Sequence, residues 1–176
     1  PIWNLAVNHD HLGPYNVVAF FNWEDEAKTV TTTTKELGIS DTEYIGLEFW
    51  EGQPFHYKTL DKELSMIVPP RGVRVVTLHT VTDTPQWIGS DRHISQNGME
   101  ITNMDWDNTR KQLKGTVQVI ETFPVTMHIR IPDKYTFKGI KCKYVKYSVS
   151  KGLDIVSITL TGKKTDNIDF AVEFIV

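Results

Sequence analysis

Apolar and polar residues alternate over short stretches along most of the chain, and glycine, proline, asparagine and aspartate separate these stretches. A repeat of two residues is the pattern of β-strands that have one buried and one exposed face. The repeat of about 3.6 residues that marks an amphipathic helix is nearly absent. Only residues 34–37, before Gly38, fit a single helical turn. The pattern therefore predicts an all-β protein.

Six short strands are predicted in the first half of the chain, at residues 15–22, 28–33, 43–50, 55–59, 64–68 and 73–79. Residues 17–21 and 73–78 are apolar on most of both faces, which is typical of strands in the middle of a sheet. Tight turns are expected at residues 51–54 and 69–72, because both segments contain proline and glycine. These features predict a small β-sandwich.

A polar segment at residues 80–85 ends in Pro85, which favours an extended conformation for the residue before it. We interpret this segment as a junction between residues 1–82 and residues 83–176. Asn97-Gly98 is a favoured hairpin dipeptide. Further strands are predicted at residues 98–106, 112–121, 125–131, 135–150 with a break near Gly139, 155–161 and 168–176. The predicted fold is two consecutive small antiparallel β-sandwich modules.

The size and hydropathy of the chain exclude some functional classes. With 176 residues the chain is too short for an eight-stranded (β/α) barrel, which takes about 250 residues. The longest purely apolar run, Val17–Phe21, is far shorter than the roughly 20 residues of a membrane-spanning helix, so no span is expected. The sequence begins at Pro1 rather than at methionine, and we expect it to be part of a longer protein.

A single cysteine, Cys142, excludes an internal disulfide and a cysteine-based zinc site. Lys141 and Lys143 flank it, and neighbouring cations could lower the pKa of the thiol and make it reactive. A half-buried cysteine on a strand is the simpler interpretation. We expect no cofactor.

The charge is unevenly distributed along the chain. Residues 1–84 carry 6 basic and 12 acidic residues, whereas residues 85–176 carry 13 and 10. Within residues 130–164 the counts are 9 basic and 2 acidic, and tyrosine and phenylalanine lie between the lysines. A solvated sheet face is the simplest interpretation; an acidic partner domain and an anionic polysaccharide are alternatives. Nucleic-acid binding is not expected, because the whole chain is slightly acidic and shows no glycine-aromatic RNA motif and no helix-turn-helix pattern.

Three strings in the first half resemble a known protein family. They are VVAFFNWEDEAKTVTTTTKELGI at residues 17–39, EFWEG at 48–52 and LSMIVPPRGVRVVTL at 64–78. Together they resemble the C-terminal β-sandwich that follows the catalytic barrel in α-galactosidase-like glycoside hydrolases of the melibiase clan, especially large bacterial members. Residues 1–5 look like the segment that leaves the barrel. Residues 87–94 and 105–107 resemble the further all-β domain that some of these enzymes append.

The resemblance implies a role without catalysis. In that family the catalytic pair are aspartates on barrel strands, and none of the barrel is present in this sequence, so no catalytic residue is expected. The chain would instead brace the catalytic domain of its parent enzyme and shape access to substrate. Trp3, Trp23 and Trp50 are the expected residues of that domain interface.

The alternative function is a carbohydrate-binding module, because such modules stack exposed aromatic rings on pyranose faces. In two small sandwiches most tryptophans are expected in the cores or at the junction. Trp87 and Trp106 are the candidates for sugar binding.

Two groups of carboxylates contain the residue types of a glycosidase catalytic pair, which is held about 5–9 Å apart. Residues 24–26, Glu-Asp-Glu, lie where a hairpin turn is expected, and turn carboxylates are normally solvated. Asp105 and Asp107 would share one face of a strand, but a turn with Asn108 explains them more simply.

Two further groups contain the residue types of metal or catalytic sites. His9 and His11 could contact one metal ion from an extended segment, but no third ligand is identifiable nearby, and a polar loop is the alternative. Ser90, Asp91 and His93 include the types of a catalytic triad, yet sequence neighbours rarely converge as a triad requires.

Overall fold

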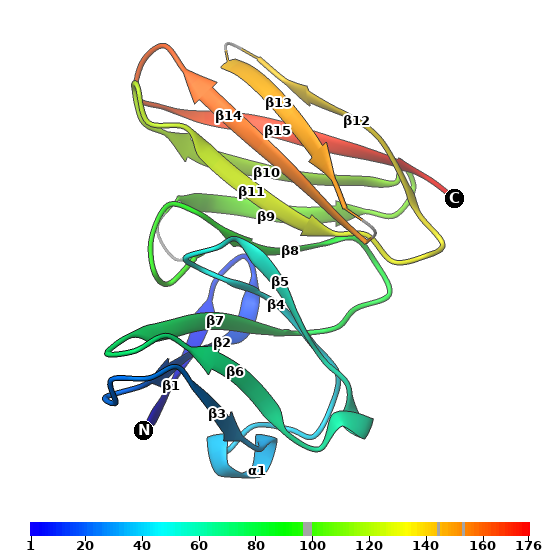
Figure 1. Cartoon of the computed structure of the whole chain (residues 1–176). Helices are drawn as coiled ribbons and strands as arrows, with labels where there is room; N and C mark the ends of the chain where they lie inside the picture. Colours follow the sequence, from blue (N-terminus) through cyan, green and yellow to red (C-terminus); the bar gives the residue numbers. More distant parts are fainter. Residues whose placement is uncertain (97–99, 144, 153) are drawn as a thin grey trace. The chain divides into compact units, whose positions relative to one another are not determined.

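The computed structural model describes residues 1–96, 100–143, 145–152 and 154–176 (Figure 1). Strands account for 61% of the residues and helices for 4%, and the sheets are antiparallel, so the prediction of an all-β fold of sandwich type is confirmed. The chain divides into two compact units. Unit 1 comprises Pro1–Asn8 and Pro14–Val81, and unit 2 comprises His9–Gly13 and Thr82–Val176.

Unit 1 contains a five-stranded sheet and a two-stranded sheet (Figure 1). The larger sheet has the order β1-β2-β7-β4-β5, with β1 at Ile2–His9, β2 at Gly13–Phe21, β7 at Val73–Thr80, β4 at Tyr44–Glu48 and β5 at Gln53–Tyr57. The smaller sheet pairs β3 at Lys28–Thr32 with β6 at Leu64–Val68. Sequence-based prediction missed β1, because this edge strand is mostly exposed and does not alternate.

Alternate residues of these strands build the core of unit 1. Val18 and Phe20 of β2 are fully buried, as are Val76 and Leu78 of β7. The same cluster includes Tyr44, Tyr57, Leu64 and Val68. Each buried side chain of this size contributes roughly 1.5–3 kcal/mol to folding. Because successive side chains point to opposite faces, β2 buries Phe20 in this core and directs Phe21 to the other side of the sheet.

The single predicted helical turn is present as α1, Thr34–Leu37. Its start is a capping box, in which the Thr33 hydroxyl accepts from the backbone N–H of Glu36 at 3.1 Å and the Glu36 carboxylate accepts from the N–H of Thr33 at 3.0 Å. It ends at Gly38, whose φ of 69° is left-handed. A second turn, η1, spans Thr59–Asp61. Among the described residues, no helix has the length and hydropathy to cross a membrane.

Unit 2 is a sandwich of two four-stranded sheets (Figure 1). One sheet has the order β12-β15-β10-β9, with β12 at Thr136–Cys142, β15 at Asp166–Ile175, β10 at Gln112–Val119 and β9 at Ile101–Asp107. The other has the order β13-β14-β11-β8, with β13 at Val145–Lys151, β14 at Ile155–Gly162, β11 at Val125–Arg130 and β8 at Gln86–Ser90. Both sheets contribute buried apolar side chains to one core.

The predicted strand at residues 135–150 is wrong in one respect. The chain forms two strands there, β12 and β13, which belong to different sheets. The break lies after Cys142 rather than near Gly139, which instead marks a shift in the register of β12 against β15. Sequence-based prediction also missed β8. The predicted turn at Asn97-Gly98 lies outside the described residues.

Gly46 on β4 provides a test of the packing in unit 1. A Cβ at this position would lie 1.6 Å from the carbonyl oxygen of Thr77 on β7, and backbone cannot move aside as a flexible side chain can. We expect Gly46→Ala to lower the free energy of unfolding by at least about 3 kcal/mol. Gly139→Ala is the control, because a Cβ there meets nothing within 4 Å, and its effect should stay within about 1 kcal/mol. Urea denaturation followed by tryptophan fluorescence and circular dichroism measures both. Equal stability of the two variants would contradict the close approach of β4 and β7.

Candidate functional site

The outer face of the β12-β15-β10-β9 sheet is a continuous polar surface of unit 2. Alternation in β10 and β15 directs Leu113, Val117 and Val172 into the core, so the residues between them face outward. We call this surface the polar sheet face; its side chains are Asn103, Asp105, Asp107, Gln112, Lys114, Thr116, Lys141, Asp169, Ala171 and Glu173.

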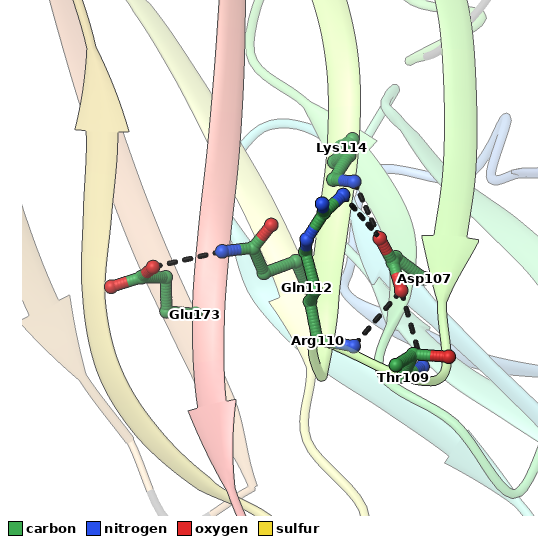
Figure 2. Close-up of polar contacts among 6 residues, drawn as sticks. All are labelled: Asp107, Thr109, Arg110, Gln112, Lys114 and Glu173. Atoms are coloured by element: carbon green, nitrogen blue, oxygen red, sulfur yellow. Dashed lines mark hydrogen bonds and ion pairs between the residues drawn. The ribbon is translucent and has the colours of Figure 1, made fainter.

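Asp107 organises one end of the polar sheet face (Figure 2). Its Oδ1 accepts hydrogen bonds from the backbone N–H groups of Thr109 at 3.1 Å and Arg110 at 2.9 Å, in the turn that follows β9. Its Oδ2 lies 2.6 Å from the Lys114 ammonium and 3.4 Å from the Arg110 guanidinium. The carboxylate therefore ties the turn to the neighbouring strand β10.

These contacts strongly favour the ionised form of Asp107. The hydrogen bond from Lys114 and the backbone hydrogen bond from Arg110 lower the pKa of Asp107 from 3.8 to about 2. The Lys114 ammonium in turn is held on the outer face of β10. This carboxylate is a fixed negative charge at any physiological pH.

Glu173 organises the middle of the same face. It lies opposite Gln112 in the register of β15 and β10, and its Oε1 accepts from the Gln112 amide at 2.8 Å (Figure 2). The same oxygen lies 2.6 Å from the Lys141 ammonium on β12. The Lys141 hydrogen bond is the main cause that lowers the pKa of Glu173, and Gln112 adds to it. Side chains from three adjacent strands are thus joined across the sheet.

An open pocket of about 1050 Å³ borders the polar sheet face. Its lining includes Lys114 and Lys141, which both lie opposite the small Ala171 in the strand register. Thr116 and Asp169 also line it, and the Thr116 hydroxyl donates to Asp169 Oδ1 at 2.7 Å. Tyr147 of β13 adds an aromatic ring that is 52% exposed. The pocket thus combines fixed polar groups with one accessible aromatic surface.

Asp107 and Glu173 are unsuited to general acid catalysis. A general acid must hold a proton near neutral pH. The pKa values of Asp107 and Glu173 are both lowered, so neither can donate one. Among the described residues, no three histidine, cysteine, aspartate or glutamate side chains are grouped as metal ligands.

Unit 1 has a second notable surface, which is aromatic. Phe21 of β2 lies between Trp3 of β1 and Trp23, with ring centroids 5.2 Å from the first and 5.4 Å from the second. The Phe21 and Trp23 rings are nearly parallel, at 12°. Trp3 is 69% exposed and Trp23 is 63% exposed. We call these three residues the aromatic strip.

Buried hydrogen bonds hold the aromatic strip in place. Asn22, which separates Phe21 from Trp23, is buried, and its amide donates to the backbone carbonyls of Glu26 at 2.7 Å and Pro69 at 3.1 Å. Its side-chain oxygen accepts from the N–H of Glu24 at 3.0 Å. The turn that carries Trp23 is therefore fixed to the end of β6, and the exposed ring has a defined position.

The other three tryptophans differ in their exposure. Trp50 is 55% exposed and packs edge-on against Phe49 at 4.9 Å, apart from the aromatic strip. Trp87 is only 3% exposed and belongs to the core of unit 2. The prediction that Trp87 stacks on a sugar is therefore wrong, because its ring has no accessible face. Alternation could not have indicated this burial, because Trp87, Ile88, Gly89 and Ser90 of β8 are all buried.

Trp106 is also unsuited to sugar stacking. Its ring packs against Tyr135 at 5.4 Å and Phe174 at 5.9 Å, on the inner side of β9. Its indole nitrogen is buried and has no hydrogen-bond partner among the described residues. The register explains this, because Trp106 lies opposite the core residue Leu113.

The acidic residues near Trp23 are solvated, as expected. Glu24 pairs with Lys28 at 2.5 Å and Asp25 pairs with Arg71 at 2.8 Å, and all four side chains are exposed. They form surface ion pairs rather than a catalytic pair. Asp107 lies at the turn that was expected for it, as described above.

The histidine and serine groups do not form catalytic or metal sites. The Nδ1 of His9 accepts from the N–H groups of His11 and Leu12 at 3.1 and 3.3 Å, so that nitrogen organises the loop. Burial is the main cause that lowers the pKa of His9. Ser90 is fully buried and donates to Glu100, whereas His93 bonds to Ser95.

Lysines of the basic stretch lie on strands of two different sheets, β12 and β13. The two strands still meet, because Lys141, Lys143 and Tyr147 line one pocket. Lys134 lies over the Tyr135 ring at 5.4 Å and Lys151 over the Phe137 ring at 5.1 Å. Tyr144 lies outside the described residues.

Cys142 lines the open pocket and is half-buried. Burial raises the pKa of its thiol, opposite to the effect expected from the adjacent lysines in the sequence. The thiol is therefore not activated.

Comparison of the sequence with protein-family models and with curated proteins finds no match. The functional interpretation therefore depends on the residues and contacts described above.

The contact between Asp107 and Lys114 can be tested by titration. In the wild-type protein we expect the carboxyl carbon of Asp107 to titrate with a pKa of about 2 in an NMR experiment. Because this pKa lies below its ordinary value of 3.8, Asp107 stabilises the fold above that value, and the contribution is lost as pH falls toward 2. Lys114→Met should raise the pKa toward 3.8, and Lys163→Met, on another turn, should not. An unchanged pKa in Lys114→Met would show that the ion pair does not form.

Proposed function

We propose that this chain is a non-catalytic accessory region of an α-galactosidase-like glycoside hydrolase, in which it braces the catalytic barrel and shapes access to substrate. The observation that carries the proposal is the aromatic strip, where Trp3 and Trp23 flank Phe21 with both indole rings in solvent. Large exposed aromatic side chains that lie together mark interaction surfaces. The sequence strings at residues 17–39, 48–52 and 64–78 support the choice of enzyme family.

The aromatic strip has the physical properties of a docking surface. Tryptophan is enriched among the residues that dominate binding energy at protein interfaces. Because the three rings already contact one another and Asn22 fixes the turn, little conformational entropy is lost when a partner binds. Leu5, two residues beyond Trp3 on β1, is also exposed and extends the apolar surface along the same face of the strand.

The opposite face of β1 anchors this edge strand. The Asn4 amide donates to the backbone carbonyl of Leu37 at 2.8 Å, and the Asn4 oxygen accepts from Asn16 at 2.9 Å. With one face bonded within unit 1, the other face is free to present Trp3 and Leu5. A barrel flank of apolar residues is the proposed partner.

One pocket of unit 1 supports the carbohydrate-binding alternative. A small pocket of about 270 Å³ adjoins the aromatic strip, lined by Phe21, Trp23, Lys28 and Thr29 among others. A sugar ring stacked on Trp23 would enter this pocket. Docking to a protein is favoured, because Trp3 and Leu5 lie outside that pocket and a single sugar site leaves them uncovered.

The purified chain should not hydrolyse an aryl α-galactoside. Asp107 and Glu173 on the polar sheet face are held ionised, and the strings that resemble the family lie outside its catalytic barrel. Release of the aryl group, followed by absorbance, should equal the rate in buffer. An active α-galactosidase serves as the positive control. Hydrolytic activity that copurifies with the chain would contradict a non-catalytic role.

The docking role predicts a specific loss of binding. We expect the double variant Trp3→Ala, Trp23→Ala to bind the separately expressed catalytic domain of the parent enzyme at least about tenfold more weakly than the wild type. Leu60→Ala is the matched control, because Leu60 is the most exposed large apolar residue of unit 1 and lies on η1 instead. Isothermal titration calorimetry gives both affinities.

All these side chains are exposed, so the variants should remain as stable as the wild type. Equal affinity of the double variant and the Leu60→Ala variant would exclude the aromatic strip as the docking surface. Loss of glycan binding by the double variant, with no binding to the catalytic domain, would favour the carbohydrate-binding alternative.

A further inference from the structure

We propose that the open pocket beside the polar sheet face of unit 2 binds a neutral oligosaccharide, with Tyr147 as the stacking surface for a pyranose ring. The inference is independent of the docking role proposed for unit 1, because every residue that lines this pocket belongs to unit 2. It also differs from sugar binding by Trp87, which belongs to the core of unit 2, or by Trp106, which is partly buried against that core.

The pocket has the size and the composition that a sugar site requires. Its volume of about 1050 Å³ lies at the upper end of the range of roughly 300–1,000 Å³ for small-molecule sites. An oligosaccharide offers many hydroxyl groups, each of which donates and accepts hydrogen bonds. The lining supplies carboxylate, amide, hydroxyl and ammonium groups from Asp169, Asn103, Thr116 and Lys114.

Several of these polar groups are already positioned. The Thr116 hydroxyl orients Asp169 at 2.7 Å, Asp107 holds the Lys114 ammonium at 2.6 Å, and Glu173 holds the Lys141 ammonium at 2.6 Å. Prior positioning reduces the entropy that is lost on binding. An ammonium that donates one of its three hydrogens to a carboxylate keeps two for a ligand. The polar sheet face is therefore a prepared set of donors and acceptors.

Two apolar elements complete the site. Tyr147 presents a ring that is 52% exposed, and a tyrosine ring has an apolar face with a polar hydroxyl at its edge. This matches a pyranose, whose C–H groups form one face and whose hydroxyls project from the rim. Ala171, between Lys114 and Lys141, carries only a methyl group and leaves the space between the two long side chains open.

The charge of the lining favours a neutral ligand over an anionic one. Asp166 and Asp169 line the pocket together with three lysines, Lys114, Lys141 and Lys143. Lys114 and Lys141 are already paired with Asp107 and Glu173, which neutralises much of their attraction for an anion. Nucleic acids and polyuronates would meet carboxylates that repel them.

The test is titration of the full chain with neutral gluco-, galacto- and manno-oligosaccharides of two to six sugar units, followed by calorimetry. We expect saturable binding to at least one series. Cys142 lines the pocket and is the only cysteine of the chain, so alkylation by iodoacetamide reports on this site alone. The bound oligosaccharide should slow that reaction.

Variants assign the binding to the pocket. Tyr147→Ala should lower the affinity for the oligosaccharide by about tenfold, because ring stacking contributes about 1.4 kcal/mol to binding. Tyr147→Phe, which keeps the ring, should stay within about threefold of the wild type. Phe123→Ala is the matched control, since Phe123 is an exposed aromatic residue elsewhere in unit 2. If Tyr147→Ala fails to fold, Asp169→Asn gives the second test, and it should also weaken binding.

Three outcomes would overturn the inference. The first is the absence of binding to every neutral series by folded protein. The second is binding only to uronate oligosaccharides in a salt-sensitive manner. The third is binding that Trp3→Ala, Trp23→Ala abolishes and Tyr147→Ala leaves unchanged, which would place the sugar on the aromatic strip. Because the aryl α-galactoside assay and the catalytic-domain titration use other surfaces, failure here leaves the proposed function standing.

Discussion

The cross-strand register of β10 and β15 is the constraint on which unit 2 depends. Val117 pairs with Ile168 and Leu113 with Val172, so both strands direct their apolar residues into the same core. Because side chains alternate, a shift of one residue would turn every core residue outward and bury Lys114 in its place. An unpaired buried ammonium is far costlier than an exposed one. Burial of the core therefore selects one register, and that register brings Gln112 opposite Glu173 and Thr116 opposite Asp169. The polar sheet face is thus a consequence of the core.

The same reasoning explains the aromatic strip. Phe20 is fully buried in the core of unit 1, so Phe21 must lie on the other face of β2. Asn22 then turns the chain with buried hydrogen bonds, and Trp23 stacks on Phe21 at 5.4 Å. Neither tryptophan of the strip is needed to complete the core cluster of unit 1. Two large rings kept in solvent without a role in that core support the proposed docking role.

The pattern of apolar and polar residues made most of the strands predictable. It did not predict which side chains are exposed to solvent. Most core strands could be recognised, either from alternation, as in Leu113 to Val119, or from a short apolar run, as in Val17 to Phe21. Edge strands β1 and β8 were missed, because β1 is mostly exposed and neither strand shows a clear alternation of buried and exposed residues. Trp87 and Trp3 illustrate the difficulty: both lie in short strands that were not recognised, yet one is 3% exposed and the other 69%. Which faces are covered is decided by tertiary packing, and a local pattern does not contain that information.

The candidate sites, like the fold, could be predicted only as far as local sequence patterns reach. The outward positions of β10 and β15 could be listed from the sequence, but the ion pair of Asp107 with Lys114 required the register between β9 and β10. Tyr147 comes from the opposite sheet, so no pattern within one strand could place it beside Lys141 in one pocket. The lysines of the basic stretch likewise belong to strands of two sheets, which a local pattern does not indicate. In a sandwich, proximity in sequence implies proximity in space only within a hairpin of one sheet.

The two surfaces differ in a way that fits different kinds of partner. An apolar surface such as the aromatic strip gains free energy by leaving water, and the gain grows with the area covered, which suits a large and lasting protein contact. The polar sheet face gains little from leaving water, because its groups are already bonded to one another and to solvent. Its advantage is fixed geometry, which suits a ligand that replaces water hydrogen bonds one for one and exchanges readily. An accessory region that is held to an enzyme by one unit and contacts a sugar chain through the other would need surfaces with these two properties.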